Sequence, residues 1–191
     1  MKKSILTLGA LLVIKLASFA QAEKGTTRII AGWGAPNIAA AVLSDVDKQT
    51  GPIHLGVKYF LSDKVSLGLI YNYSDATTKP YLYNDGINAF AYKYDAVFST
   101  FLANVDYSWK SGEKHNLYSG LGLGFVNVSA SATITTGTGE APKFTAAASG
   151  LGYHVTAIGY HGTLGAGFGA YAELGYGYNG LINAGLSYSI H

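Results

Sequence analysis

The final stretch of the sequence reads Leu181-Ile182-Asn183-Ala184-Gly185-Leu186-Ser187-Tyr188-Ser189-Ile190-His191. Apolar residues occupy every second position from Ile182 to Ile190, and small or polar residues lie between them. A strand places alternate side chains on opposite faces, so this pattern predicts one apolar and one polar face. Because no polar tail follows, we expect the last residues to be held in a sheet.

The same alternation recurs in seven further segments. Besides residues 181–190, it predicts strands at about 26–34, 52–61, 65–73, 96–109, 115–127, 153–161 and 168–178. The strand at 153–161 is the least regular, because neither face is uniformly apolar. Eight strands with an apolar face towards lipid and a polar face towards a lumen indicate an all-β fold, an eight-stranded antiparallel up-and-down transmembrane β-barrel.

Aromatic residues before the fourth strand do not fit its pattern. Phe90, Tyr92 and Tyr94 fall on the opposite parity to the apolar residues from Val97 to Trp109. Two explanations remain open. Either a β-bulge lies near residues 95–96, or these aromatics belong to a loop hairpin above the membrane.

The connections alternate between long and short. Residues 35–51, 74–94 and 128–152 are long, whereas 62–64, 110–114 and 162–166 are short, and Asn179-Gly180 predicts a tight turn. Long outer loops and short periplasmic turns are typical of outer-membrane barrels. The apolar residues 35–43 could form a short helix that caps the barrel mouth or touches lipid. Residues 128–149 are rich in Ala, Thr, Ser and Gly, and are either flexible or extend the strands above the membrane.

The beginning of the sequence predicts export. Met1-Lys2-Lys3 is basic, residues 5–14 form a short apolar core, and Ala20-Gln21-Ala22 has the small-residue pattern that signal peptidase recognises. We therefore expect a signal peptide at residues 1–22 and a barrel domain at 23–191. The uncharged run is shorter than the roughly 18 residues that a membrane-spanning helix needs.

The amino-acid composition argues against several classes of function. Without Lys2, Lys3 and Lys15, the thirteen Lys and Arg residues fall to ten, against eleven Asp and Glu. A near-neutral chain without a basic cluster argues against nucleic-acid binding, which needs concentrated positive charge. The absence of cysteine excludes disulfides, a thiol nucleophile and Cys-ligated metal.

Four charged residues stand out because they lie within strands and on the lumen parity: Arg28, Lys58, Asp106 and Glu173. A gate or proton-linked site is one interpretation. We favour a structural plug, because an eight-stranded barrel encloses a space that side chains can fill. Glycines at every second position, as at 120–124 and 165–169, would make room for inward rings such as Tyr118 and Tyr171.

Aromatic residues form two predicted groups. One group suits the membrane interface, where one end of the ring is apolar and the other is wet; it comprises Trp33, Tyr59, Tyr71, Tyr73, Tyr107, Trp109, Tyr176, Tyr178 and Tyr188. The second lies in a predicted outer loop, where exposed rings suit protein or glycan binding; it comprises Tyr81, Tyr83, Phe90, Tyr92 and Tyr94.

The last quarter of the chain resembles a known family. Residues 168–178, Phe-Gly-Ala-Tyr-Ala-Glu-Leu-Gly-Tyr-Gly-Tyr, followed by 181–190, are similar to the paired final strands of the small eight-stranded outer-membrane β-barrel family, represented by the transmembrane domain of OmpA and by OmpX-like proteins. The resemblance implies an outer-membrane location and contact with outer-membrane lipid. It also implies assembly through the C-terminal strand, although the family usually ends in an aromatic residue and this chain ends in Ser189-Ile190-His191.

The resemblance leaves several functions open. We expect a non-enzymatic barrel whose outer loops bind an unknown extracellular ligand, with no cofactor or metal. Passage of small or apolar solutes, as in porin- or OmpW-like proteins, is the alternative. Lipid A hydrolysis is less favoured, because His54, His115, His154 and His161 have no local serine and carboxylate partners in the sequence.

Overall fold

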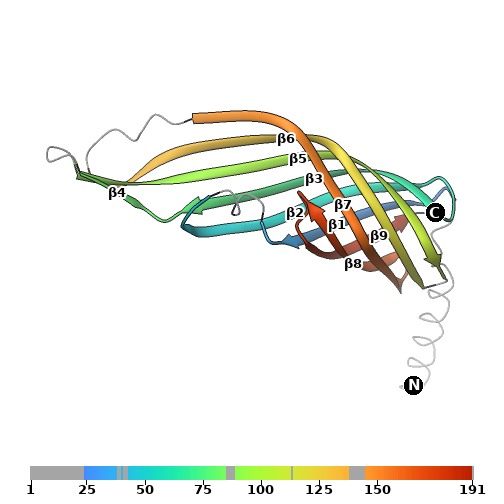
Figure 1. Cartoon of the computed structure of the whole chain (residues 1–191). Coiled ribbons are helices and arrows are strands. Elements are labelled where there is room, and N and C mark those ends of the chain that lie inside the picture. The colour runs from blue at the N-terminus through green and yellow to red at the C-terminus, as the bar shows by residue number, and fades with distance from the viewer. Residues whose placement is uncertain are drawn as a thin grey trace, which may run out of the picture.

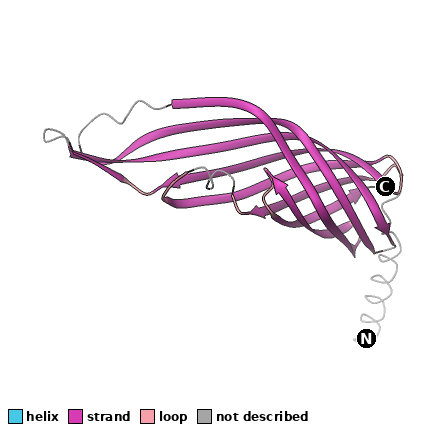
Figure 2. Ribbon diagram, viewed as in Figure 1, coloured by secondary structure: helices cyan, strands magenta, loops and turns pink. Residues whose placement is uncertain are grey.

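The computed structural model describes residues 24–37, 40, 43–84, 89–112, 114–137 and 145–190. Within them, nine strands form one sheet (Figures 1 and 2). The strands are β1 Thr27–Ala35, β2 Val46–Phe60, β3 Val65–Thr78, β4 Tyr81–Asn84, β5 Ala89–Ser111, β6 His115–Gly137, β7 Thr145–Gly165, β8 Phe168–Gly177 and β9 Ile182–Ile190.

Eight of these strands close into a barrel. Each is antiparallel to its neighbours, β1 pairs with both β2 and β9, and β3 pairs with β5 to complete the ring. The short strand β4 lies outside the ring and pairs with β5 alone. The predicted eight-stranded antiparallel barrel is therefore confirmed.

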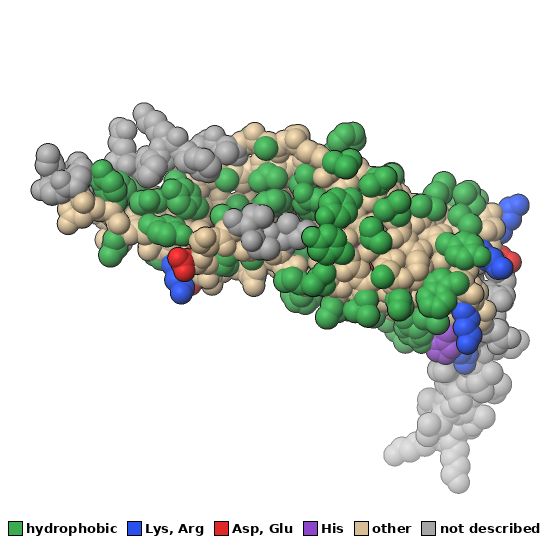
Figure 3. Space-filling view, in the orientation of Figure 1, with side chains coloured by type: hydrophobic (Ala, Val, Ile, Leu, Met, Phe, Trp, Pro, Cys, Tyr) green, Lys and Arg blue, Asp and Glu red, His purple; other side chains and the backbone are tan. Residues whose placement is uncertain are grey.

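Side chains alternate across the barrel wall as the sequence pattern predicts. On β9, Leu186 is 63% exposed, whereas the neighbouring Ser187 is 4% exposed. The exposed large apolar side chains come from every strand of the ring, and in Figure 3 they spread over the barrel surface while Lys, Arg, Asp and Glu appear at its ends. This belt requires an apolar surrounding, so the barrel spans a membrane.

Three strands are much longer than a membrane requires. β5 and β6 have 23 residues and β7 has 21, whereas a tilted strand crosses a bilayer in about 9–11. Their upper parts, together with those of β2 and β3 and the β4 hairpin, continue beyond the barrel away from the chain termini (Figure 1). We call this part the extension; it comprises residues 46–51, 74–84, 89–99, 126–137 and 145–152.

The polarity of the wall reverses where the extension begins. Lower on β6, the outward side chains are apolar, as at Leu121, Leu123 and Phe125. Above them the outward set is polar and the inward set is apolar: Asn127, Ser129, Ser131, Thr133 and Thr135 point outward, and Val126, Val128, Ala130, Ala132 and Ile134 point inward. A polar outer face is compatible with water but not with lipid, so this reversal marks the membrane boundary.

An apolar cluster fills the barrel mouth at the base of the extension. Ala76, Ala96, Phe98 and Val126 are buried together, and we call them the mouth cluster. Ala40 and Leu43 pack against it. Of the two explanations for the apolar residues 35–43, capping of the mouth therefore fits these two, while residues 38, 39, 41 and 42 lie outside the described ranges.

Several loop predictions were wrong. Residues 46–51 and 74–78 were expected in long loops but lie in strands. Of the two alternatives for residues 128–149, extension of the strands holds for the described part, because 128–137 continue β6 and 145–149 belong to β7. The aromatic residues before the fourth strand follow the second explanation: Tyr81 pairs with Tyr92 and Tyr83 with Phe90 in the β4–β5 hairpin. No bulge lies near residues 95–96, because the β3 and β6 registers are continuous there.

A β-bulge explains why the predicted strand at 153–161 was irregular. The β7–β8 register shifts between Thr156 and Ile158, and the β6–β7 register shifts opposite it. Before the shift His154 and Thr156 are buried, and after it Gly159 and His161 are buried. Because the extra residue Ala157 changes the parity, no single alternation describes the whole strand.

Two further features of the chain concern its helices and its beginning. The described residues include no helix that is long and apolar enough to cross a membrane. The predicted signal peptide, residues 1–22, lies outside the described residues.

Candidate functional site

The charged residues of the lumen meet near the end of the barrel that carries the chain termini. Lys58 on β2 lies between Asp106 on β5 and Glu173 on β8. Its Nζ is 2.7 Å from Asp106 Oδ2 and 3.8 Å from Glu173 Oε1. All three residues are at most 6% exposed, so water screens these contacts little.

Neighbouring polar groups complete the network. Asp106 accepts hydrogen bonds from Ser66 Oγ at 3.2 Å and Asn104 Nδ2 at 2.6 Å. The Tyr118 hydroxyl donates to Glu173 Oε1 at 2.7 Å, and Lys58 Nζ lies 5.0 Å from the centre of the Tyr118 ring. Removing one member of such a buried network is costly, because it leaves the charge of the other member buried without a partner.

Arg28 is close to this network but is held differently. Its guanidinium lies 4.7 Å from the Phe60 ring centre, and its Nε donates to Ser189 Oγ at 3.2 Å. Within the part of the chain that the structure describes, it forms no ion pair. The free volume between these side chains is about 10 Å³, at the lower limit for one water molecule.

A neutral polar layer lies between the charged residues and the mouth cluster. His54 contacts the Tyr171 hydroxyl at 2.5 Å. Other atoms of this layer have no hydrogen-bond partner among the described residues; they belong to His54, Asn72, His154, Asn179 and Asn183. Buried polar atoms need partners, so this layer is the least tightly satisfied part of the lumen.

One serine–histidine contact was not found by sequence reasoning. His161 Nε2 on β7 lies 2.8 Å from Ser187 Oγ on β9. Both residues are about 4% exposed inside the barrel, and no described carboxylate bonds to His161. The contact therefore lacks the orienting group and the access that nucleophilic catalysis needs. His115 instead stacks on Tyr160 at the barrel surface.

The predicted loop aromatics gather into one structure. In the β4–β5 hairpin, ring centres lie 5.9 Å apart for Tyr81 and Tyr92, 4.9 Å for Tyr83 and Phe90, and 5.5 Å for Tyr92 and Tyr94. We call these five residues the aromatic ladder. Phe90 is buried, whereas the four tyrosines are half-buried or exposed, so the ladder leaves part of its ring surface open to solvent. The Tyr81 hydroxyl donates to the Ser44 carbonyl at 3.3 Å.

The predicted interface aromatics are mostly on the outer wall. Tyr71 is half-buried and packs on Phe101 with ring centres 4.7 Å apart. Tyr178 departs from the prediction, because β8 ends at Gly177 with a φ of 135° and Tyr178 then packs against the mouth cluster. The most exposed members are Trp33, Tyr59, Tyr107, Trp109, Tyr176 and Tyr188.

The barrel and its apolar belt define a membrane-spanning protein of the outer-membrane type. The N-terminal β-barrel domain of OprF from Pseudomonas aeruginosa matches with a TM-score of 0.54 and 16% identity, over 87% of this chain and 98% of that chain. Ail from Yersinia pestis, solved with the heparin analogue sucrose octasulfate, has a TM-score of 0.49 and 15% identity, over 87% and 99%. OprG from Pseudomonas aeruginosa has a TM-score of 0.43 and 13% identity, over 88% of this chain and 97% of that chain.

These similarities are structural. No family model matches the sequence, and no curated protein matches it. At 16% identity, the match to the OprF domain establishes a shared fold and nothing narrower.

Proposed function

We propose that the chain is an integral outer-membrane protein that binds an extracellular ligand through the aromatic ladder and has no enzymatic activity. The observation that carries this proposal is the ladder itself: five aromatic side chains share one face of a hairpin that stands beyond the membrane boundary. A folded barrel does not need exposed rings at that distance from lipid. Tyrosine contributes a large, rigid and amphipathic surface, which suits sugar rings and protein surfaces alike.

The lumen has a structural role in this proposal. The pairing of Lys58 with Asp106 and Glu173, and the small space left around Arg28, support a plug rather than an open channel. Outer-membrane lipid around the belt and the barrel-assembly machinery at β9 are the other proposed partners.

A binding experiment on whole cells tests the ladder. Cells that display the protein are applied to immobilised glycans and extracellular-matrix proteins, and retention is compared with that of a Tyr81→Ser, Tyr92→Ser, Tyr94→Ser variant. Because hot-spot aromatics each contribute about 1–2 kcal/mol, we expect the variant to bind more than roughly tenfold more weakly. Leu82→Ser is the matched control: Leu82 is 89% exposed in the same strand, but on the other face. Equal binding by the triple variant, or an equal loss in Leu82→Ser, would reject the proposal.

Passage of small apolar solutes is the second candidate. The observation in its favour is the apolar inner face of the extension, which leads from Ile134 down β6 to Val126 in the mouth cluster. The buried charges further down oppose it, because an apolar solute would have to displace the Lys58–Asp106 pair. Conductance and uptake measurements separate the two candidates.

A further inference from the structure

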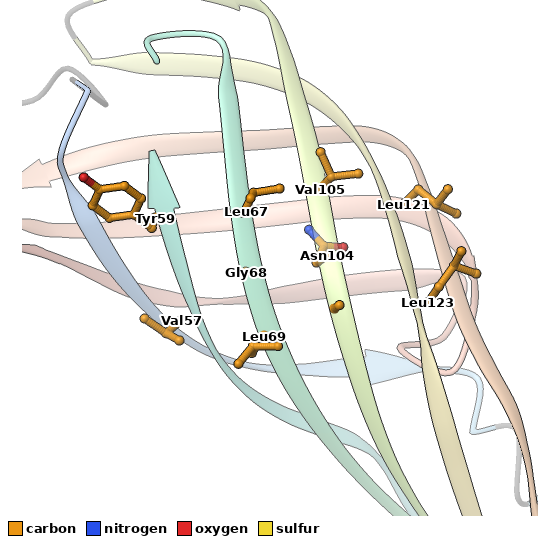
Figure 4. A pocket seen from close by; sticks show the side chains of 10 residues that line it. Val57, Tyr59, Leu67, Gly68, Leu69, Asn104, Val105, Leu121 and Leu123 are labelled. Carbon is orange, nitrogen blue, oxygen red and sulfur yellow. The ribbon is translucent and has the colours of Figure 1, made fainter. Parts of the chain in front are cut away.

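A groove crosses the lipid-facing wall over β2, β3, β5 and β6. Two overlapping hollows, of about 630 and 720 Å³, share Val57, Leu69, Ala103 and Leu123. Figure 4 shows the lining of the first, with Val57, Leu69 and Leu123 among its labelled residues. Their linings are almost entirely apolar. The groove therefore lies within the belt that faces the membrane.

A small residue in a row of large ones creates the groove. Ala103 is directly opposite Leu69 on one side and Leu123 on the other. The adjacent row towards the extension carries rings, with Tyr71 opposite Phe101 and Phe101 opposite Phe125. The short side chain of Ala103 thus leaves a depression below a ridge of aromatic rings.

The position of the groove limits what can fill it. Its wall is inside the membrane, so the occupant is either a lipid chain or another membrane-spanning surface. A second copy of the barrel presents the same convex wall, and two convex walls touch along a line without entering a depression. A flexible acyl chain can follow the depression and bury the apolar surface of its lining.

The charged residues near the groove indicate which class of lipid supplies the acyl chain. At its lower end, towards the chain termini, the groove is bounded by Tyr59 and Leu67. Beyond these residues, the Lys64 carbonyl accepts from Ser108 N at 2.7 Å, and Lys110 follows two residues later on β5. Both lysine side chains are exposed, so they meet phosphate at the membrane surface.

Among the described residues, neither Lys64 nor Lys110 forms an ion pair. The Asp63 carboxylate, next to Lys64 in the chain, accepts from the backbone nitrogen of Lys24 at 3.3 Å and keeps its negative charge, which the two lysines outnumber. The upper end of the groove differs, because the outward residues above Phe101 and Phe125 are the uncharged Val97, Ser99, Asn127 and Ser129. Lys48, Lys79 and Lys93 lie further along in the extension, where Lys93 is paired with Asp95 at 3.3 Å. The basic end of the groove is therefore the lower one.

We propose that this groove binds one anionic phospholipid from the leaflet nearest the chain termini, with an acyl chain over Ala103 and the phosphate at Lys64 and Lys110. This site is independent of the aromatic ladder and requires only that the barrel spans a membrane. It would make the lipid a specific ligand of one side of the barrel, distinct from the lipid that surrounds all sides.

Native mass spectrometry of the purified full-length protein tests the site. The protein is released from detergent that contains equal amounts of phosphatidylglycerol and phosphatidylcholine, and bound lipids are counted. We expect one retained phosphatidylglycerol, preferred roughly tenfold over phosphatidylcholine. Ala103→Phe should abolish retention of both lipids, and Lys64→Gln with Lys110→Gln should abolish only the preference.

Ala172→Phe is the matched control, because Ala172 is an exposed alanine on β8 that does not line the groove. It should retain the lipid as the unmodified protein does, and a heat-dependent shift on a gel shows that each variant is folded. Equal loss in Ala103→Phe and Ala172→Phe, or full retention in Ala103→Phe, would overturn the proposal. An unchanged preference in the lysine variant would overturn the headgroup assignment, and a dimer lost only in Ala103→Phe would assign the groove to a second copy.

Discussion

Lys58 contacts two carboxylates, but the contacts are unequal. Asp106 is 2.7 Å from the Lys58 Nζ and accepts two further hydrogen bonds, whereas Glu173 is 3.8 Å away and accepts from Tyr118. Removing one member of a buried ion pair leaves an uncompensated charge, and the cost grows with the closeness of the contact. The two carboxylates should therefore differ in their contribution to stability.

The first prediction compares these carboxylates. Asp106→Ala should lower the free energy of unfolding by about 3–5 kcal/mol, and Glu173→Ala by less, because Asp106 still pairs with Lys58. Glu173→Gln should lose least, since an amide oxygen can still accept from Tyr118. Urea unfolding in detergent, followed by the fluorescence of Trp33 and Trp109, measures these values. Equal losses in all three variants would contradict the geometry.

The second prediction concerns Gly159 on β7, where the Tyr118 ring passes directly over the backbone. A Cβ at Gly159 would overlap this ring, so Gly159→Ala should destabilise the barrel by about 1–3 kcal/mol. Gly150 in the same strand is the control, because its Cβ would meet only Val126 Cγ1 at 3.7 Å. Adding Tyr118→Ala to Gly159→Ala should remove the clash but lose the hydrogen bond to Glu173. If Gly150→Ala costs as much in the same urea assay, crowding by Tyr118 is not the cause.

At the scale of the strand, β6 remains one continuous strand as it passes from lipid into water. Outward Leu123 lies in the belt, and outward Thr133 lies in the extension ten residues further along the chain. The third prediction uses the absence of cysteine from the sequence. On intact cells, Thr133→Cys should react with an impermeant maleimide, whereas Leu123→Cys should not.

Ser111→Cys completes the same experiment at the opposite end of the barrel. Ser111 is exposed at the end of β5, next to the short turn to β6. It should react only after the outer membrane is permeabilised. Labelling of Ser111→Cys but not Thr133→Cys on intact cells would reverse the orientation.

The strands that could be predicted are those in which one face meets lipid and the other meets the lumen along the whole strand. In β9, lipid on one side and lumen on the other produce the alternation from Ile182 to Ile190. The part of the extension in residues 128–149 could be predicted only as one of two alternatives, because its polarity is reversed on β6 and its Ser, Thr and Ala residues resemble a loop in composition. β7 was unclear because one extra residue at Ala157 shifts its parity.

The candidate sites could likewise be predicted only in part. Parity placed Lys58, Asp106 and Glu173 inside the barrel, but it could not separate Arg28 from the ion-paired group, because the distances depend on strand stagger around the ring. The same limit hid the contact between His161 and Ser187, which are on strands separated by β8. The glycine that makes room for Tyr118 is Gly159 rather than those at 120–124, for the same reason.

At the scale of the whole molecule, the lumen consists of three layers along the barrel. The ion-paired residues around Lys58 lie at one end, the polar layer of His54, Asn72, His154, Asn179 and Asn183 follows, and the mouth cluster lies at the base of the extension. An ion that crosses this barrel must pass buried charges and an apolar layer. The layer of buried charges and the apolar mouth cluster both oppose steady conduction, because an ion must lose its hydration water to pass either of them, and this loss costs free energy.

The fourth prediction therefore concerns conduction. The purified protein in a planar bilayer should show no steady ion conductance, because side chains fill the cross-section of an eight-stranded barrel. Glu173→Ala leaves Lys58 and Arg28 with one carboxylate, and it should admit at most brief openings of small amplitude. Phe98→Ala, which thins the mouth cluster without changing the charge, should remain closed because the ion-paired layer is intact. A large and stable conductance from the unmodified protein would show that the layers do not close the lumen, and solute passage would then replace ligand binding as the leading function.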